Sequence, residues 1–141
     1  MIEATRELLA DRRDVWAVVS EPYHLAEWWP GYQGITPDRR GLAEGARWKI
    51  IRGIGPGFLR RPEAEGTIEI VRVLEGYELR WRDFEQGFEA GIQLDNAGVG
   101  RTRARAFTEG PWWRLLAEGG RALPRQALAR LYDLCQTAVE L

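Results

Sequence analysis

The sequence is nearly free of the residues that build metal sites and disulfides. It contains one histidine, His24, and one cysteine, Cys135, whereas a metal site needs several imidazole, thiolate or carboxylate ligands at close spacing. We therefore expect no metal and no cofactor. A single cysteine cannot form an internal disulfide. Because Cys135 falls on the apolar side of a helical pattern, we interpret it as a small core residue and not as a nucleophile.

Long apolar runs and an excess of basic charge are also missing. No hydrophobic run approaches the roughly 18 residues that a membrane-spanning helix needs, and the N-terminus carries acids and arginines where a signal peptide would be apolar. We therefore expect no membrane span and a cytoplasmic location. The formal net charge is -1. This value argues against a nucleic-acid-binding protein, because phosphate contacts need a basic face.

What remains is an ordinary globular composition that is rich in tryptophan. Hydrophobic residues make up 45% of the 141 residues and charged residues 29%, as in folded domains, and the length predicts a single domain over residues 1–141. Seven residues are tryptophans. Four of them form two adjacent pairs, in "EWWPG" (27–31) and "GPWWR" (110–114), near opposite ends of the chain. These pairs suggest that aromatic surface is needed at two places.

The first part of the chain predicts a strand followed by two short helices. Residues 1–9 alternate between apolar and polar side chains, as in a half-buried strand, and Arg6 interrupts the apolar side. The next apolar stripe predicts a short helix with Trp16 in the core. A second helix opens at Pro22 and stops at Pro30-Gly31, since proline favours a helix start and glycine a helix end.

The segment 45–109 predicts antiparallel strands joined by tight turns. Apolar and charged residues alternate through it, and the short turns imply hairpins with one face buried. Between residues 64 and 74 the apolar side changes parity, which predicts a bulge near Val71 or Arg72. We interpret the charged parity as a solvated outer face, on which acids and arginines of neighbouring strands form ion pairs.

From Pro111 onward the chain is predicted to be helical. Apolar residues recur at spacings of three and four, while Gly119, Gly120 and Pro124 weaken the first third, so that the firm helix begins near Pro124. A curved antiparallel sheet and one amphipathic helix must cover each other. The sequence thus predicts an α+β domain, in which a sheet of about six or seven strands wraps around a long C-terminal helix, with two short helices after the first strand.

This order of elements resembles the helix-grip fold of the START-like superfamily, also called SRPBCC, and especially its bacterial polyketide cyclase/dehydrase branch. The local wording is similar in three stretches, "DRRDVWAVVSEPYHLAEWWPG", "GARWKI" and "LARLYDLCQ", and the resemblance covers nearly the whole chain. It implies a cavity between the sheet and the long helix. In that family such a cavity commonly holds lipids, sterols, polyketides or other apolar small molecules.

Within that fold, ten residues are predicted to contact the ligand. The inward parity of the strands supplies an apolar wall, the two tryptophan pairs flank the entrance, and a guanidinium on the first strand pairs with an acidic ligand group. The predicted ligand-binding residues are Arg6, Trp28, Trp29, Trp48, Tyr77, Trp81, Phe88, Ile92, Trp112 and Trp113. Two alternatives stay open: Arg6 extends to the strand end or pairs with an internal acid such as Asp83, and the four paired tryptophans simply plug one end of the domain.

Three functions are compatible with these residues. The leading one is a carrier, sensor or sequestering protein for a hydrophobic small molecule, because it needs only a cavity. The second is an enzyme of the cyclase or aromatase kind, with Arg6, Tyr77 and His24 as its polar candidates and no assigned catalytic residue. The third is an interaction module similar to the chaperone-activator branch of the superfamily. The glycine-rich segment 53–62 is interpreted as a lid or as a partner contact.

Overall fold

The computed structural model describes the backbone of residues 1–54 and 61–140 and the side chains of residues 1–52, 65–116 and 120–136. Most of the glycine-rich segment 53–62, which was expected to be a lid or a partner contact, lies outside the described residues. In chain order the elements are β1 (Ile2–Leu8), α1 (Arg12–Val19), a 3-10 turn (Pro22–His24), α2 (Leu25–Trp28), β2 (Tyr32–Thr36), β3 (Arg47–Ile54), β4 (Arg61–Leu74), β5 (Glu78–Asp83), β6 (Phe88–Gly98), β7 (Arg101–Glu109), α3 (Trp112–Leu115), a 3-10 helix (Ala117–Ala122) and α4 (Leu123–Glu140).

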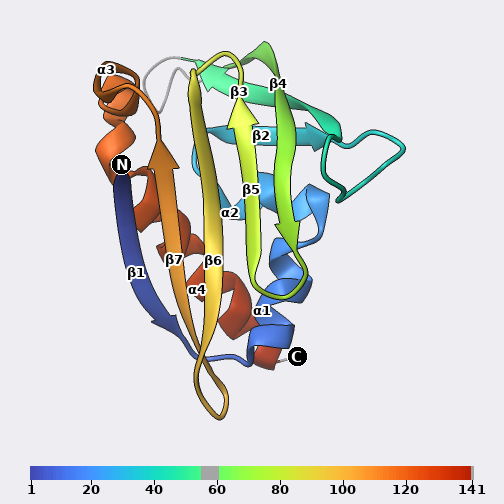
Figure 1. The fold of residues 1–141 in the computed structure, drawn as a ribbon, viewed down its shortest axis with the longest axis vertical. Helices are drawn as coiled ribbons and strands as arrows, with labels where there is room; N and C mark the ends of the chain where they lie inside the picture. Colours follow the sequence, from blue (N-terminus) through green and yellow to red (C-terminus); the bar gives the residue numbers. More distant parts are fainter. Residues whose placement is uncertain (55–60, 141) are drawn as a thin grey trace.

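The seven strands within the described residues form one sheet in the order β1-β7-β6-β5-β4-β3-β2. Every neighbouring pair is antiparallel. Helix α4 packs against β1 and β7 and contacts α2, and Figure 1 shows it crossing behind the sheet on the same side as α1 and α2. The predicted α+β architecture, a curved antiparallel sheet gripping the C-terminal helix, is confirmed.

The hydrophobic core lies between the sheet and these helices. We call the sheet face that packs on α2 and α4 the inner face. The predicted alternation places large apolar side chains on it, and small residues are buried there too. The inner-face residues with almost no exposed surface include Trp48, Ile50, Ile68, Ile70, Leu79, Trp81, Ala90, Ile92, Leu94, Ala104 and Ala106. From α4, the apolar stripe buries Ala127, Leu128, Leu131 and Cys135.

Two irregular parts of the sheet are the bulge in β4, which the sequence pattern predicts, and strand β2, which it does not. The pairing of β4 with β5 shifts register between Ile70 and Arg72, so the predicted bulge is confirmed. Strand β2 was not expected. Its two buried residues, Tyr32 and Ile35, lie three positions apart, because the pairing with β3 shifts between Tyr32 and Gly34. A strand with such a shift lacks the strict alternation by which strands are predicted.

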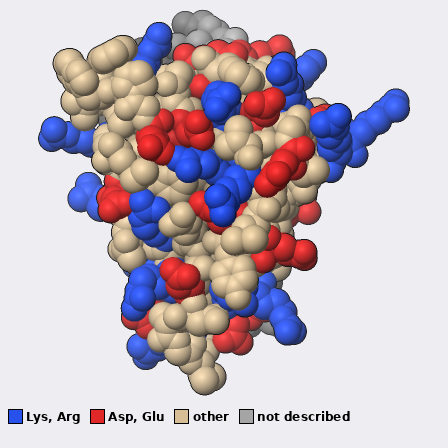
Figure 2. Space-filling model, viewed as in Figure 1, with Lys and Arg blue, Asp and Glu red and all other residues tan. Residues whose placement is uncertain are grey.

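The opposite face of the sheet carries interspersed charges, as Figure 2 shows. Arg80 lies 3.0 Å from Glu89 on the neighbouring strand, and Arg72 lies 2.6 Å from Glu78. Arg101 pairs with Glu7 across β7 and β1 at 3.1 Å. The prediction of cross-strand ion pairs on an outer face is therefore confirmed.

The C-terminal region is interrupted as predicted. Helix α4 begins at Leu123, one residue before Pro124. At Gly120 the chain folds back so closely that an added Cβ atom would lie 1.8 Å from the carbonyl oxygen of Leu115, so only glycine is accommodated there. In α1, by contrast, Trp16 is only partly buried against the core. The expectation that Trp16 is a core residue was too strong, because Val15 and Val19 take the buried positions of that helix.

Candidate functional site

Three tryptophans meet on the inner face and form what we call the tryptophan cluster: Trp28, Trp29 and Trp81. Trp28 ends α2 and Trp29 leaves the helix in an extended conformation. Their ring centroids are 6.0 Å apart, and they lie 5.9 and 5.0 Å from the ring of Trp81, all edge to face. Both residues of the first pair are completely buried. Neither side chain therefore reaches the surface.

A polar network of Tyr32, Arg52 and Asp83 lies beside the tryptophan cluster. The Tyr32 hydroxyl donates to Oδ2 of Asp83 at 2.6 Å, and Arg52 donates to Oδ1 at 2.9 Å. The backbone N–H of Gln86 donates to the same Oδ1 at 2.9 Å. The indole of Trp81 in turn donates to the Tyr32 oxygen at 3.2 Å. Three strands, β2, β3 and β5, are thus tied together through one buried carboxyl group.

Burial decides the electrostatics of this network. It raises the pKa of Asp83 above its ordinary value, although the hydrogen bonds from Tyr32 and Gln86 and the charge of Arg52 act in the opposite direction. The pKa of Tyr32 lies well above its usual value, first because of burial and then because of the neighbouring Asp83. Tyr32 therefore stays a neutral hydrogen-bond donor. The charge of the Asp83 carboxylate is balanced by Arg52 within hydrogen-bonding distance.

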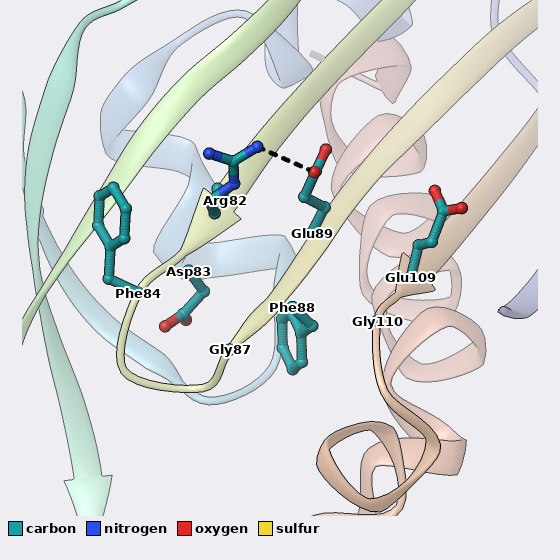
Figure 3. A pocket seen from close by; sticks show the side chains of 8 residues that line it. All are labelled: Arg82, Asp83, Phe84, Gly87, Phe88, Glu89, Glu109 and Gly110. Atoms are coloured by element: carbon teal, nitrogen blue, oxygen red, sulfur yellow. Dashed lines mark hydrogen bonds and ion pairs between the residues drawn. The ribbon is translucent and has the colours of Figure 1, made fainter.

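A surface pocket of about 270 Å³ opens at the end of β5 and β6. We call it the rim pocket; it is lined by Arg82, Asp83, Phe84, Gly87, Phe88, Glu89, Glu109 and Gly110. Figure 3 shows Arg82, Glu89 and Glu109 pointing to one side of the hairpin, whereas Asp83 and Phe88 point to the other. The pocket therefore contacts the polar network through Asp83 and the core through Phe88, which is buried.

The strand register places a row of inner-face residues directly below the rim pocket. Asp83 pairs with Phe88 at the rim, and the next inward pair is Trp81 with Ala90. Ala90 also pairs with Thr108 of β7. Adjacent strands are about 4.8 Å apart, so the Cα atoms of Trp81 and Thr108 are separated by roughly 10 Å. The single methyl group of Ala90 lies between them.

Two buried polar atoms near this row have no hydrogen-bond partner among the described residues: Nε1 of Trp28 and Oγ1 of Thr108. Other buried groups of the same kinds are satisfied. The Trp48 indole donates to the carbonyl of Gly41 at 2.9 Å, and the Thr102 hydroxyl donates to the carbonyl of Ala10 at 2.7 Å. Because buried polar groups are nearly always paired, each exception calls for an explanation.

The structure brings six of the ten predicted ligand residues together in the core. Those buried in it are Trp28, Trp29, Trp48, Trp81, Phe88 and Ile92. The other four are exposed. Trp112 and Trp113 are exposed by 69% and 58% on α3, and their rings pack edge to face at 5.9 Å. Side chains without charge also gather over α3 in Figure 2.

Arg6 and Tyr77 have the predicted parity but are not enclosed. Arg6 is exposed on the edge strand β1, and its guanidinium lies 4.1 Å from the ring centre of Tyr132 on α4. Tyr77 precedes β5, is exposed by 42%, and holds the guanidinium of Arg12 at 3.9 Å. Of the alternatives left open for Arg6, the structure agrees with the one in which the side chain extends to the surface, since an edge strand leaves it free to do so. The internal acid Asp83 is paired with Arg52 instead.

Sequence reasoning missed three residues of this region: Tyr32, Arg52 and Thr108. Tyr32 belongs to the unexpected strand β2, and Arg52 is one of many arginines on strands of alternating charge, so neither carried a distinguishing signal. Thr108 continues the inward parity of Ala104 and Ala106, which are buried. A polar residue at the end of that apolar series was the available clue.

The remaining reactive side chains lie elsewhere. His24 is exposed and lies 3.2 Å from Glu27 one helical turn later. Cys135 is buried, and burial raises the pKa of its thiol to about 11. Among the described residues, no group of three His, Cys, Asp or Glu side chains is placed to hold a metal ion. No helix within residues 1–54 and 61–140 is both long and apolar enough to span a bilayer.

Comparison with known proteins supports the fold. No family model and no curated protein sequence matches the chain. Among solved structures, a crystal structure of a Nitrosomonas europaea protein superimposes with a TM-score of 0.71 at 19% identity, covering 99% of this chain and 96% of that one. Norcoclaurine synthase from Thalictrum flavum superimposes with a TM-score of 0.66 at 17% identity, covering 99% and 86%.

The di-domain ARO/CYC StfQ from the steffimycin biosynthetic pathway adds a third match. It superimposes with a TM-score of 0.71 at 11% identity over 99% of this chain and 46% of StfQ. The chain has the START-like helix-grip fold. Proteins of this fold commonly bind hydrophobic ligands. In this chain the layer between the inner face and the helices contains the tryptophan cluster and the two unpartnered polar atoms.

Proposed function

We propose that the protein binds a hydrophobic small molecule between the inner face of the sheet and helices α2 and α4, as a carrier, sensor or sequestering protein. The observation that carries this proposal is the pair of unpartnered polar atoms, Trp28 Nε1 and Thr108 Oγ1, buried in an otherwise apolar layer. A buried donor or acceptor without a partner costs about 1–3 kcal/mol. A ligand that supplies the missing hydrogen bond offsets that cost.

The surroundings of these atoms suit an apolar molecule. The tryptophan cluster presents large aromatic surfaces, and each indole buries roughly 150–250 Å². Ala90 contributes only a methyl group between Trp81 and Thr108. At that point of the row, the side chain therefore projects least from the inner face of the sheet. Sites for small molecules are typically apolar with a few placed polar groups. In the proposal, Trp48, Phe88 and Ile92 extend the apolar wall.

The α3 tryptophans are proposed to flank the entrance. Trp112 and Trp113 follow Gly110, which lines the rim pocket, and the side chain of Arg114 lies near Gly87 of the same pocket. Exposed aromatic side chains at a pocket margin shield an apolar ligand from water as it enters. The rim pocket is therefore the proposed route to the inner row.

Two measurements test the proposal. Native mass spectrometry of freshly purified protein should detect a bound small molecule of a hydrophobic kind. Binding of neutral naphthalene derivatives, measured by isothermal titration calorimetry, should be lost in Ala90→Leu, since the larger side chain fills the space above the row. Ala97→Leu, in the same strand but away from the row, is the matched control. Absence of both a copurified ligand and any probe binding would overturn the proposal.

One observation also favours an enzymatic alternative on the same bound ligand. The earlier polar candidates Arg6, Tyr77 and His24 are exposed, but Asp83 and Tyr32 form a buried carboxyl and hydroxyl pair with raised pKa values. Such perturbed groups are enriched in catalytic sites. Asp83→Asn should then abolish turnover of the copurified ligand while leaving its binding intact. If Asp83→Asn loses neither turnover nor binding, the Asp83–Tyr32 pair has a structural role alone.

A further inference from the structure

The described residues of the proposed site include an unpartnered hydrogen-bond donor and no buried charge that lacks a partner. This combination restricts the chemistry of the ligand. We infer that the ligand is uncharged and presents a hydrogen-bond acceptor, such as a ketone or quinone carbonyl oxygen, to Nε1–H of Trp28. The inference rests on the proposed function. It adds the chemical class of the ligand, which neither the fold nor its relatives specify.

The first step concerns the kind of hydrogen bond. An indole N–H is a donor only, so the partner of Trp28 must be an acceptor. Trp28 is completely buried, and its ring stands edge to face to both Trp29 and Trp81. The neighbouring indole of Trp81 already has the Tyr32 oxygen as its acceptor. A ligand oxygen is therefore needed at Trp28 and not at Trp81.

The second step concerns charge. Of the described residues that are buried on the inner face, Asp83 is the one that ionises as an acid. Its charge is balanced by Arg52, which also lies 3.5 Å from Glu85. The other inward guanidinium, Arg6, is exposed and stacked on Tyr132. A ligand carboxylate would lose its hydration without gaining a cation.

The third step places the acceptor relative to the apolar body. Thr108 lies two strands from Trp81 in the same row, and its hydroxyl both donates and accepts. It therefore tolerates either a carbonyl or a hydroxyl on the far side of the ligand. The tryptophan cluster and Ala90 provide apolar contacts for the portion of the ligand that lies between Trp28 and Thr108. A flat ring system with one carbonyl near Trp28 satisfies each of these groups.

The test uses three naphthalenes of nearly the same size: 2-acetylnaphthalene, which is a ketone; 2-ethylnaphthalene, which has no acceptor; and 2-naphthoate, which is charged at neutral pH. We expect the ketone to bind about tenfold more tightly than either of the others, since a buried donor left unpaired costs about 1–3 kcal/mol and 1.4 kcal/mol is tenfold. In Trp28→Phe the ketone should lose about tenfold in affinity, and the ethyl compound less than about twofold. Trp16→Phe, on the partly buried face of α1, is the control and should change neither.

A second measurement does not depend on the variant folding. In the wild-type protein, the NMR signal of the Trp28 indole N–H should move downfield with the ketone and not with the ethyl compound. Equal binding of the three compounds, tightest binding of naphthoate, or an unshifted indole signal with bound ketone would overturn the inference while leaving hydrophobic binding established. If none of the three compounds binds, the proposed function fails together with the inference.

Discussion

The hydroxyl of Tyr32 lies 2.6 Å from Oδ2 of Asp83, although 51 residues separate them along the chain. Tyr32 begins β2 at one edge of the sheet, and Asp83 ends β5, three strands away. In a flat sheet three strand spacings amount to roughly 14 Å. The bond therefore forms only because the sheet curls, and Figure 1 shows β2 crossing behind β5.

Replacing Tyr32 with phenylalanine tests the strength of that closure. The variant leaves one oxygen of Asp83 and the indole of Trp81 without their partner, so the free energy of unfolding should fall by about 1–3 kcal/mol. Urea denaturation measures the change. Tyr23→Phe removes a hydroxyl from an exposed tyrosine and should stay within about 0.5 kcal/mol of the wild type. Equal effects of the two substitutions would contradict the role assigned to the bond.

Asp83 should give stability a specific pH dependence. Its pKa is raised in the folded protein, so the stability that it contributes is complete below the unfolded pKa and is lost as pH rises through the folded pKa. The stability of the wild type relative to Asp83→Asn should therefore decrease as the pH rises above the ordinary carboxyl pKa of about 4. Asp95→Asn, which changes an exposed carboxylate of β6, is the control. A difference that grows with pH would show that the hydrogen bonds outweigh burial.

The exposed and the buried tryptophans should separate in stability and in ligand release. Trp81→Ala should lower the free energy of unfolding by about 3–5 kcal/mol. Trp112→Ala and Trp113→Ala should change it by less than about 0.5 kcal/mol, because both side chains are mostly exposed. Stopped-flow release of bound 2-acetylnaphthalene should become faster in the two α3 variants. Unaltered release would remove these residues from the proposed entrance.

Cys135 should be inert toward thiol reagents in the folded protein. With a pKa of about 11, roughly one thiol in a thousand is ionised at pH 8, and the thiolate is the reactive form. Burial of the side chain on the inward face of α4 blocks access as well. Alkylation by iodoacetamide, followed by mass spectrometry, should be at least about a hundredfold slower in buffer than in denaturant. Rapid labelling under native conditions would indicate that α4 opens readily from the sheet.

The fold was predictable because its elements follow regular periods. The alternation in β3, β5, β6 and β7 assigned the inner face, and the parity change near Val71 located the bulge of β4. Strand β2 escaped because a register shift after Tyr32 breaks the alternation within five residues. Periodic patterns describe regular elements, so an irregular edge strand leaves no comparable signal.

The candidate site was only partly predictable, because its polar contacts depend on curvature. Parity correctly placed Trp48, Trp81, Phe88 and Ile92 in the core. It also placed Arg6 inward, but parity does not show that an edge strand lets a long side chain turn outward. The pairing of Arg52 with Asp83 requires the registers of β3, β4 and β5 together with the curl of the sheet. Neighbouring residues in the sequence do not encode that combination.

The pairing of β1 with β7 joins two segments that are synthesised at very different times. Ile2 pairs with Thr108 and Leu8 with Thr102, so β1, the first of the seven described strands to be synthesised, waits for β7, which is the last of them. Until β7 appears, β1 has no hydrogen-bonded neighbour in the sheet. Contacts between such distant residues slow folding, and unpaired strand edges favour aggregation. A nascent chain that pauses before residue 101 would therefore expose both β1 and the inner face. Chaperones that bind it during the pause would protect it until β7 and α4 are made.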